Sequence, residues 1–357
     1  MTSSKSIVHS GSVASPPQNP SRITVVFASD ANYLQAAKLA IYAASQHTSG
    51  LVDFVLLTGA SQIAPEDCAD LRAVLKPGHS LRIIECTDPR LRNCALFVEY
   101  ITIASFFRLL LPELLPDASR CIYLDCDVLV LDDLQKLWAE AGPDAPLCAV
   151  REIQKEAELL HTAILGTPDY FNSGVLVLNL DLWRAHQYTD ACFRLATSGD
   201  PRLTLQDQDV LNLIFRDNTC FLDMRWNLLG SVFDSRASNV RFFSRTEWLR
   251  LRDHPGIAHF ASKNKPWNLA MQQHWSLAYW QRVMKSPWAP AYAGRFAKAR
   301  RQYAIWRVKH WIKWAVQIRF KPSQHLIFIV LFGHKFSFLT PLNTATRTQD
   351  PVTRLPV

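Results

Sequence analysis

Paired-cysteine motifs are missing from this chain of 357 residues. None of its eight cysteines belongs to a CxxC pair, and no His-rich spacing accompanies them. This absence argues against a structural zinc site. Several of the cysteines lie inside apolar runs, where cysteine behaves as a small hydrophobic residue. We therefore expect reduced thiols, as in a cytosolic protein.

Long hydrophobic segments are missing too. Residues 1–21 are rich in serine and proline and hold no continuous apolar stretch, which argues against a signal peptide or anchor and predicts a disordered leader. The apolar run Leu326–Phe332 is far too short to span a bilayer. A hydrophobic content of 48% is still ample for a core, so most of the chain is expected to fold.

Acidic residues are absent between His254 and Gln349, a stretch that holds fifteen lysines and arginines and seven of the eleven tryptophans. The rest of the chain has 24 basic and 31 acidic residues, a net charge of −7. A basic, tryptophan-rich segment on a mildly acidic body predicts an anionic partner, either a membrane or a nucleic acid.

A membrane is the partner that we favour for the basic segment. Basic residues beside tryptophans suit an interfacial helix on anionic lipid, and the segment has no recognisable nucleic-acid-binding fold. The alternative is that part of it packs on the rest of the protein. At helical spacing Lys309 and Lys313 lie opposite an apolar side, which consists of Ala304, Val308, Trp311, Ile312 and Ala315.

Strand and helix patterns alternate along the first half of the chain, although the dinucleotide-binding GxGxxG motif is absent. This alternation predicts an α/β fold with a mostly parallel sheet. Strands are expected at Ile23–Ala28, Val52–Leu57, Leu81–Glu85, Arg120–Leu124, Pro146–Val150, Gly174–Leu180 and Ile257–Phe260, and helices at Leu34–His47, Pro65–Lys76, Ile101–Leu115 and Leu205–Phe215.

Two aspartates, Asp125 and Asp127, directly follow the predicted strand Arg120–Leu124. Residues i and i+2 of a strand point to the same side, so two carboxylates can bind one hard cation, which in turn suits a diphosphate. A solvated turn or a helix cap is the alternative for such a pair. The position after a buried strand favours a ligand site. A second pair, Asp207 and Asp209, begins a predicted helix, where capping is the simpler interpretation.

Three isolated residues also attract attention. Arg108 is the lone charge in an apolar helical pattern, where arginine either extends to the surface or binds a buried anion. His259 ends a predicted strand and Lys265 follows in a polar loop. Taken singly, such a histidine is more often a hydrogen-bonded core residue than a ligand, and such a lysine is more often solvated.

Five stretches in this order resemble glycosyltransferase family 8, the metal-dependent retaining sugar transferases with a GT-A fold. They are FASDANY, SFFRLLLPELLP followed by CIYLDCDVLV, YFNSGVLVLNLDLWR, LQDQDVLN and HFASKNKPW, within Ile23–Trp267. The resemblance is strongest to bacterial enzymes that add galactose or glucose to the lipopolysaccharide core or lipooligosaccharide. It implies a Rossmann-like GT-A fold, with the basic, aromatic C-terminal region as a helical extension.

The resemblance also implies roles for individual residues. Asp125, Asp127 and His259 match the metal ligands, and Lys265 and Ser262 match positions at the diphosphate. Catalytic roles are implied for Gln208, Asp207, Arg108 and Lys265. The positions that match the binding site of the nucleotide sugar are Ala28, Ser29, Asp30, Asn32, Tyr33, Arg108, Cys126, Asn172, Asp207, Gln208, Ser262 and Lys265, with Tyr33 stacking on the base.

Two positions depart from the family pattern. Ser262 stands where glycine is usual, and it can still offer its N–H to an oxygen if its φ is negative. Cys126 stands where an aliphatic residue is commoner. The position that would carry a nucleophile for double displacement holds Gln208, a poor nucleophile, so we favour front-face displacement for retention.

The resemblance implies a hexosyltransferase that moves galactose or glucose from a UDP-sugar to a glycan or glycolipid, with lipopolysaccharide core as the expected acceptor. The metal set suits Mn²⁺ first and Mg²⁺ second. The expected organisation is a leader at 1–21, a catalytic domain at 22–292 and a membrane-associating region at 293–357. The protein is expected to be cytoplasmic and peripheral on the inner membrane, without nucleic acid. The alternatives are a catalytically weak UDP-sugar-binding protein and a self-glucosylating enzyme that resembles glycogen primers.

Overall fold

A computed structural model describes residues 22–98, 102–152, 169–230, 243–270, 274–321, 326–331 and 334–339. The predicted leader at 1–21 lies outside these residues. The chain divides into two compact units, Met1–Ala261 and Ser262–Val357. The catalytic-domain end that we expect at residue 292 stays a prediction.

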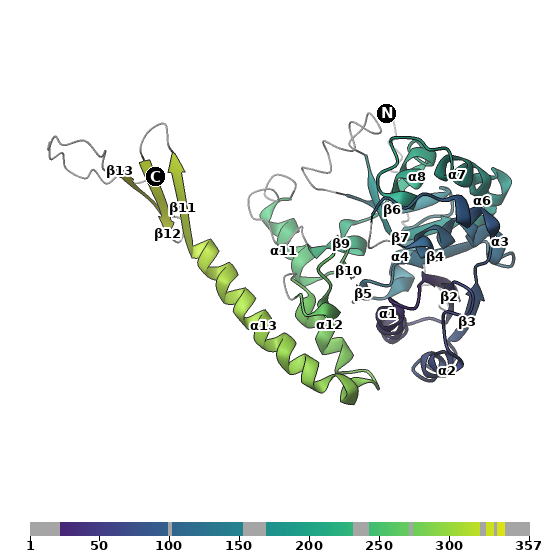
Figure 1. Cartoon of the computed structure of the whole chain (residues 1–357), viewed down its shortest axis with the longest axis horizontal. Coiled ribbons are helices and arrows are strands. Elements are labelled where there is room, and N and C mark those ends of the chain that lie inside the picture. Colours follow the sequence, from purple (N-terminus) through teal and green to yellow (C-terminus); the bar gives the residue numbers. More distant parts are fainter. Residues whose placement is uncertain are drawn as a thin grey trace, which may run out of the picture. The chain divides into compact units, whose positions relative to one another are not determined.

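A seven-stranded sheet runs through the first unit in the order β3-β2-β1-β4-β7-β6-β8 (Figure 1). The strand pairs β1–β2, β2–β3, β1–β4 and β6–β8 are parallel, whereas β7 runs antiparallel to β4 and β6. The predicted α/β fold with a mostly parallel sheet is confirmed. The strands are β1 Ile23–Ala28, β2 Val52–Thr58, β3 Ser80–Glu85, β4 Arg120–Leu124, β6 Leu147–Arg151, β7 Phe171–Asn179 and β8 Thr219–Phe221.

Helices cover this sheet, which is why its central strands are apolar on both faces. In β1 the alternating residues Val25 and Val26 are both fully buried. Val26 belongs to a core cluster with Tyr123 of β4 and with the helices α7 and α8. The helices of the first unit are α1 Leu34–His47, α2 Pro65–Ala73, α3 Leu111–Leu114, α4 Leu134–Glu140, α6 Leu180–Ala185, α7 Tyr188–Ala196, α8 Gln206–Ile214 and α11 Arg245–Asp253.

The predicted helix at Ile101–Leu115 differs in its geometry. Ile103–Leu110 forms the 3₁₀ helix η2, and only Leu111–Leu114 is α-helical. Proline at position 112 lacks the N–H that an α-helix would donate to the Arg108 carbonyl, and the N–H of Leu111 bonds this carbonyl instead. Two further 3₁₀ segments in this unit, η1 at Pro89–Asn93 and η3 at Met224–Asn227, are shorter than η2.

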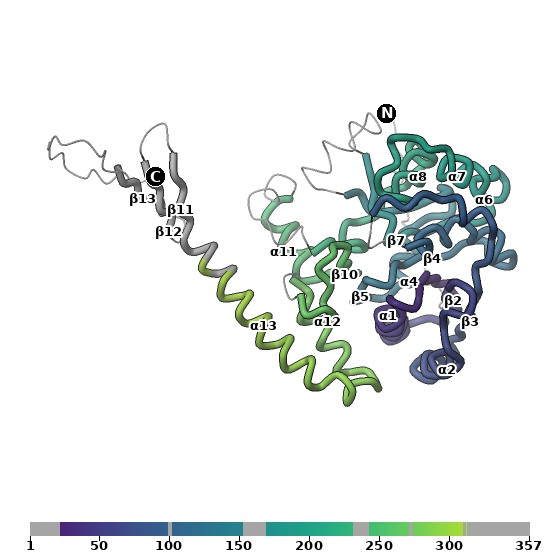
Figure 2. The backbone as a smooth tube through the Cα atoms, viewed as in Figure 1, coloured from purple at the N-terminus to yellow at the C-terminus, as the bar shows by residue number. Residues whose placement is uncertain are grey.

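A second, three-stranded sheet in the first unit joins segments far apart in the sequence. It consists of β5 Val128–Val130, β9 Leu228–Leu229 and β10 Ile257–His259, with β10 in the middle. β10 pairs antiparallel with β5, so that His259 lies opposite Val128. Figure 2 traces the chain from β4 into β5 and labels β10 close to β5. The end of β10 is thereby fixed beside the residues that follow β4.

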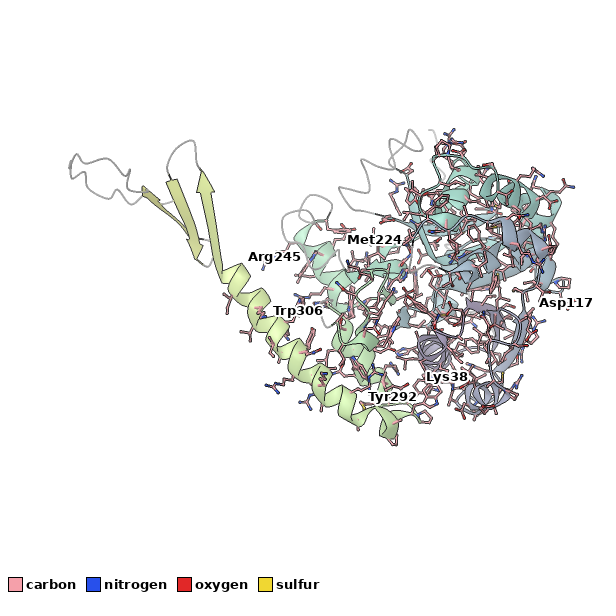
Figure 3. All side chains as sticks on the ribbon, in the orientation of Figure 1. Lys38, Asp117, Met224, Arg245, Tyr292 and Trp306 are labelled. Carbon is pink, nitrogen blue, oxygen red and sulfur yellow. The ribbon has the colours of Figure 1, made fainter. Side chains whose placement is uncertain are left out.

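The second unit is built on the long helix α13, Ala289–Ala315, which confirms the helix expected in the basic region. It packs with η4 Pro266–Asn268 and α12 Ser276–Val283: Trp280 Nε1 donates to Pro266 O at 3.0 Å, and Tyr303 on α13 donates to His274 O at 3.1 Å. Figure 3 labels Tyr292 and Trp306 on α13. No helix in the described part of the chain is long and apolar enough to cross a membrane.

An antiparallel sheet follows α13, and the sequence pattern did not predict this sheet. β11 Val316–Lys321, β12 Leu326–Leu331 and β13 His334–Leu339 pair along their whole lengths, with the apolar β12 in the middle. Most of the short apolar run at 326–332 is therefore a central strand, whose backbone groups are satisfied by its two neighbours.

Candidate active site

The candidate site lies where β4 ends, between the ends of its two neighbours in the sheet. β1 is parallel to β4, so the segment after β1 starts beside Asp125. β7 is antiparallel, so its beginning lies there too, and Asp125 N donates to Gly174 O at 2.8 Å. Strand order thus brings together carboxylates and amides that lie far apart in the sequence.

Asp125, Asp127 and His259 form a cluster in which one ligand atom from each lies within 4.8 Å of the others. His259 Nε2 is 3.1 Å from Asp127 Oδ1 and 4.0 Å from Asp125 Oδ2. The imidazole is buried, while both carboxylates are partly exposed. A bond from Phe260 N to Asp127 O extends the pairing of β10 and holds this arrangement.

This donor set fits a divalent cation. Ligand atoms about 2.0–2.2 Å from one ion lie roughly 3 Å apart, which matches the 3.1 Å between His259 and Asp127. Two carboxylates and one imidazole suit Mn²⁺, Mg²⁺ or Zn²⁺ chemistry, and the partly exposed side leaves room for further oxygen ligands.

Arg108 holds one of these carboxylates in place. Arg108 is 3% exposed, and its guanidinium donates to Asp125 Oδ1 at 2.8 Å and stacks on the Tyr123 ring at 4.2 Å. Tyr123 donates its hydroxyl to the same Asp125 oxygen at 3.0 Å. Arg108 therefore does not extend into solvent. Its guanidinium forms ion pairs with two carboxylates of the protein, Asp125 and Asp207.

Asp207 lies at the start of α8, 3% exposed. Its Oδ2 is 3.2 Å from Arg108 Nε and accepts from the Ser173 hydroxyl at 3.2 Å. Burial nevertheless raises the pKa of Asp207 to about 6, because loss of hydration outweighs the attraction of Arg108. The preceding residue, Gln206, has the left-handed φ of 46°, which costs energy for a non-glycine residue.

Gln208 and Asn172 form an amide pair next to Asp207. Asn172 Nδ2 donates to Gln208 Oε1 at 3.0 Å, and Ser173 N donates to the same oxygen at 3.1 Å. Both side chains are half-buried. Asp209, by contrast, has a structural role, because its carboxylate accepts from the N–H groups of Thr204 and Leu205. The capping interpretation of the second aspartate pair therefore suits Asp209 but not Asp207.

The end of β1 supplies the residues that we expect to bind the nucleotide. Asp30 Oδ1 accepts from the N–H groups of Asn32 and Tyr33, at 2.9 and 3.0 Å, and so shapes the turn before α1. Cys126 Sγ donates to Ala28 O at 3.0 Å and ties this turn to the aspartate pair. Burial keeps the pKa of Cys126 well above its usual range, so its neutral thiol serves this contact. Ser29, which the sequence also predicts here, is buried.

Ser262 and Lys265 belong to the second unit. The exposed Ser262 forms a turn with Asn264, whose N–H donates to Ser262 Oγ at 3.2 Å. Among the described residues, the non-glycine positions with left-handed φ are Ser61, Gln187, Gln206 and Leu269, so the serine fits its backbone conformation without strain. Lys265 is buried, and its ammonium lies 5.8 Å from the Trp267 ring centroid.

Four residues of this region were missed by sequence reasoning. Tyr123 and Asn227 contact the predicted metal ligands, and burial raises the pKa of the neighbouring Glu152 to about 7. Gly174 approaches His259 so closely that an added Cβ would lie 2.3 Å from its Cε1. A glycine inside a strand pattern is the one available signal, because it often marks a close approach. The other three have no local signature.

Comparisons with known proteins agree with this geometry. General stress protein A of Bacillus subtilis (strain 168) is 29% identical over 218 residues, 60% of this chain and 76% of the relative. Lipopolysaccharide 1,2-glucosyltransferase of Escherichia coli (strain K12) is 24% identical over 301 residues, 81% of this chain and 86% of the relative. The crystal structure of galactosyltransferase LgtC with donor and acceptor sugar analogues matches with a TM-score of 0.63 and 26% identity, over 74% of this chain and 96% of that chain.

The family itself follows from the extent of the match. Residues 24–270 match the family model for Glycosyl transferase family 8, and this range includes all the residues of the candidate site. The fold agrees, because the chain superposes on the structure of galactosyltransferase LgtC with a TM-score of 0.63. The chain therefore belongs to glycosyl transferase family 8.

Proposed function

We propose that the protein transfers a hexose, galactose or glucose, from a UDP-sugar to a glycan or glycolipid with retention of configuration, using Mn²⁺. The observation that carries this proposal is the cluster of Asp125, Asp127 and His259, beside the buried Arg108–Asp207 pair. A cation in this cluster would lie between two groups: the predicted nucleotide residues after β1 and the predicted sugar residues at β7 and α8.

Different residues of the protein bind the uridine and the hexose. Asp30, Asn32 and Tyr33 bind the uridine, and Asn172, Asp207 and Gln208 bind the hydroxyls of the hexose. Asp125, Asp127 and His259 would hold the metal, which when bound would supply Lewis-acid chemistry for the diphosphate leaving group. Lys265 adds a positive charge for the same oxygens, so that the leaving group is stabilised most in the transition state.

Front-face displacement is the mechanism that we favour for retention. The anomeric carbon–oxygen bond to the diphosphate breaks, the acceptor oxygen bonds the same face, and the acceptor proton passes to the departing phosphate oxygen. Support comes from Gln208, whose Oε1 already accepts two hydrogen bonds and is a poor nucleophile. Asp207 is a weak candidate as well, because its Oδ2 contacts Arg108 and Ser173.

The test of this function is a screen of UDP-sugars for hydrolysis and transfer with added Mn²⁺. We expect turnover of UDP-galactose or UDP-glucose that EDTA abolishes and Mn²⁺ restores, with Mg²⁺ giving less. Transfer to truncated core oligosaccharides would then identify the acceptor. Binding of UDP-sugar without turnover under any metal would instead favour the catalytically weak binding protein, and metal-independent turnover would contradict the proposed site.

The acceptor class is supported by an apolar stripe on α13. Ile305, Val308 and Ile312 are 45%, 56% and 49% exposed. At about 100° per residue they lie within about 60° of one another, on the side of the helix opposite the buried Ala299. At the same spacing, Lys298 and Lys309 lie along one edge of the stripe, and Arg301 continues its line toward the start of the helix. An apolar stripe with basic flanks suits the surface of an anionic membrane, where a lipid-linked acceptor is found.

Replacing this stripe should release the protein from anionic membranes. We expect the triple variant I305D/V308D/I312D to lose at least about 50-fold in partitioning onto phosphatidylglycerol vesicles, since each apolar side chain contributes roughly 1–2 kcal/mol when buried. Hydrolysis of UDP-sugar should persist. Vesicle co-sedimentation measures this, with L51D, a change at an exposed apolar residue outside α13, as the control. Undiminished sedimentation of the triple variant would contradict the membrane assignment.

A further inference from the structure

A continuous chain of hydrogen bonds leads from the predicted metal ligand His259 into α8. His259 Nδ1 lies 2.8 Å from Asn227 Oδ1, and Asn227 Nδ2 lies 3.0 Å from Asn172 Oδ1. Asn172 Nδ2 continues to Gln208 Oε1, and Gln208 Nε2 to the Tyr170 hydroxyl at 3.2 Å. We call this set the polar relay; it consists of His259, Asn227, Asn172, Gln208, Tyr170 and Asp209, to which Tyr170 donates.

Backbone N–H groups determine which way each amide of the relay points. Gly174 N donates to Asn172 Oδ1 at 3.0 Å, so this atom of Asn172 is its oxygen. Asn227 must then meet it with its NH₂ group, which leaves the Asn227 oxygen facing His259. At the other end, Ser173 N donates to Gln208 Oε1 and identifies that oxygen in the same way. A backbone N–H has no alternative role, so these orientations are unambiguous.

The orientation of Asn227 places a hydrogen on His259 Nδ1. An amide oxygen only accepts, so the hydrogen in this contact belongs to His259 Nδ1. The other ring nitrogen, Nε2, is the atom that faces Asp125 and Asp127. Asn227 is 3% exposed and His259 2%, so water does not compete for the contact. Imidazoles that bind metals commonly donate their second N–H to such a partner, which fixes the ring and tautomer.

We propose that Asn227 is the positioning residue that fixes His259 for the metal and couples it to the amide pair Asn172 and Gln208. This inference rests on the proposed metal-dependent transfer. Asparagine suits the position because it accepts from His259 and donates to Asn172 with the same planar group. The ring orientation at the metal and the orientation of the amides that face the sugar are therefore set by one side chain.

The two contacts of Asn227 can be separated by substitution. Asn227→Ala removes both contacts. Asn227→Asp keeps an acceptor for His259 Nδ1 but places a carboxylate oxygen against Asn172 Oδ1. We expect N227A to weaken Mn²⁺ binding about 10- to 100-fold, the usual cost of losing such a partner. N227D should keep the Mn²⁺ dissociation constant within about threefold of the native value, yet lower kcat about 10-fold or more at saturating Mn²⁺, because the amide pair loses its orientation.

Electron paramagnetic resonance of free Mn²⁺, titrated with the full-length protein, measures metal binding without turnover. N212A is the control for loss of a buried amide, because within the described part of the chain Asn212 bonds only backbone groups of Phe171 and Gln208. It should lower thermal stability and leave Mn²⁺ affinity unchanged. D127A separates the two proposals: if it loses Mn²⁺ while N227A binds as tightly as native protein, this inference is overturned and the metal site stands. A native protein that binds no Mn²⁺ overturns both.

N227D also keeps the test decisive if N227A does not fold. Reduced kcat with native Mn²⁺ affinity in N227D supports the coupling. Native kcat in N227D shows that the contact with Asn172 does not affect turnover, and it overturns that part of the proposal. A purely structural role of Asn227 predicts instead that Mn²⁺ affinity follows thermal stability across N227A, N227D and N212A.

Discussion

Gly174→Ala is expected to abolish tight Mn²⁺ binding and to lower kcat/KM about 10²- to 10³-fold, as misplacement of a reacting group by about 1 Å already costs 10²-fold. An alanine Cβ at this position would lie 2.3 Å from His259 Cε1, 2.8 Å from Asp125 Oδ2 and 3.0 Å from His259 Nδ1. These distances are far shorter than an ordinary carbon contact. The methyl group would occupy the space between two of the three predicted metal ligands.

Neither Asp125 nor His259 can move away from the added methyl group without losing contacts. The Asp125 carboxylate is held by Arg108 and Tyr123, and the imidazole of His259 is held by Asn227 and by the pairing of β10 with β5. The imidazole must therefore rotate out of position, or β7 must shift away from β4. Overpacking of this kind usually costs about 1–3 kcal/mol of stability, so the variant should still fold.

Gly142→Ala is the matched control for the Gly174 variant, because a Cβ at Gly142 has nothing within 4 Å. It should leave Mn²⁺ affinity and turnover at native values. Titration with Mn²⁺ and initial rates with the UDP-hexose identified by the screen measure both variants. Native metal affinity in G174A would show that the cluster is not the metal site or that it repacks freely.

Asp207→Asn should lower kcat about 10²-fold or more while making the folded protein more stable at neutral pH. The carboxylate is lost from the predicted sugar site, where its contacts with Arg108 and Ser173 orient it. At the same time an ionised group is removed from a site in which it is 3% exposed. This opposition is typical of residues that are kept for function at some expense of stability.

The dependence of stability on pH isolates this effect. Burial raises the pKa of Asp207 from 3.8 to about 6, so the folded chain binds one more proton than the unfolded chain between these pH values. The free energy of unfolding therefore falls as pH rises from about 4 to 6, by up to about 3 kcal/mol for this group. D207N lacks the titration, so its stability relative to the native protein should rise across that range and then level off.

Chemical denaturation of both proteins in metal-free buffer between pH 4 and pH 8 measures this difference. Because every other titrating group is common to the two proteins, the difference reports Asp207 alone. A difference that stays constant with pH would mean that Asp207 is ionised throughout. One that falls with rising pH would mean that Arg108 stabilises the carboxylate more than burial penalises it.

The local pattern of apolar and polar residues predicts most strands of the seven-stranded sheet. It predicts few of the contacts between side chains. Strands β1 and β4 and helix α1 have the predicted bounds, since polar or turn residues mark where each pattern begins and ends. The 3₁₀ geometry of η2 was not predicted, because the effect of Pro112 reaches back over the preceding turn. The sheet at β11–β13 was missed because short apolar runs do not distinguish a strand from a helix.

The sequence by itself determined the family, the fold class and the chemical types in the candidate site, because the five stretches carry their residues in a recognisable order. Without the family resemblance, local pattern left the role of each singled-out residue open: Asp207 and Asp209 both suited helix capping, and Arg108 suited either a snorkelling or an anion-binding role. Only the tertiary structure decided that Arg108 lies between two carboxylates, that β10 carries His259 to the aspartates and that Asn227 orients its ring. The physical reason is that strand order and burial are set by contacts between segments far apart in the chain, which no local pattern records.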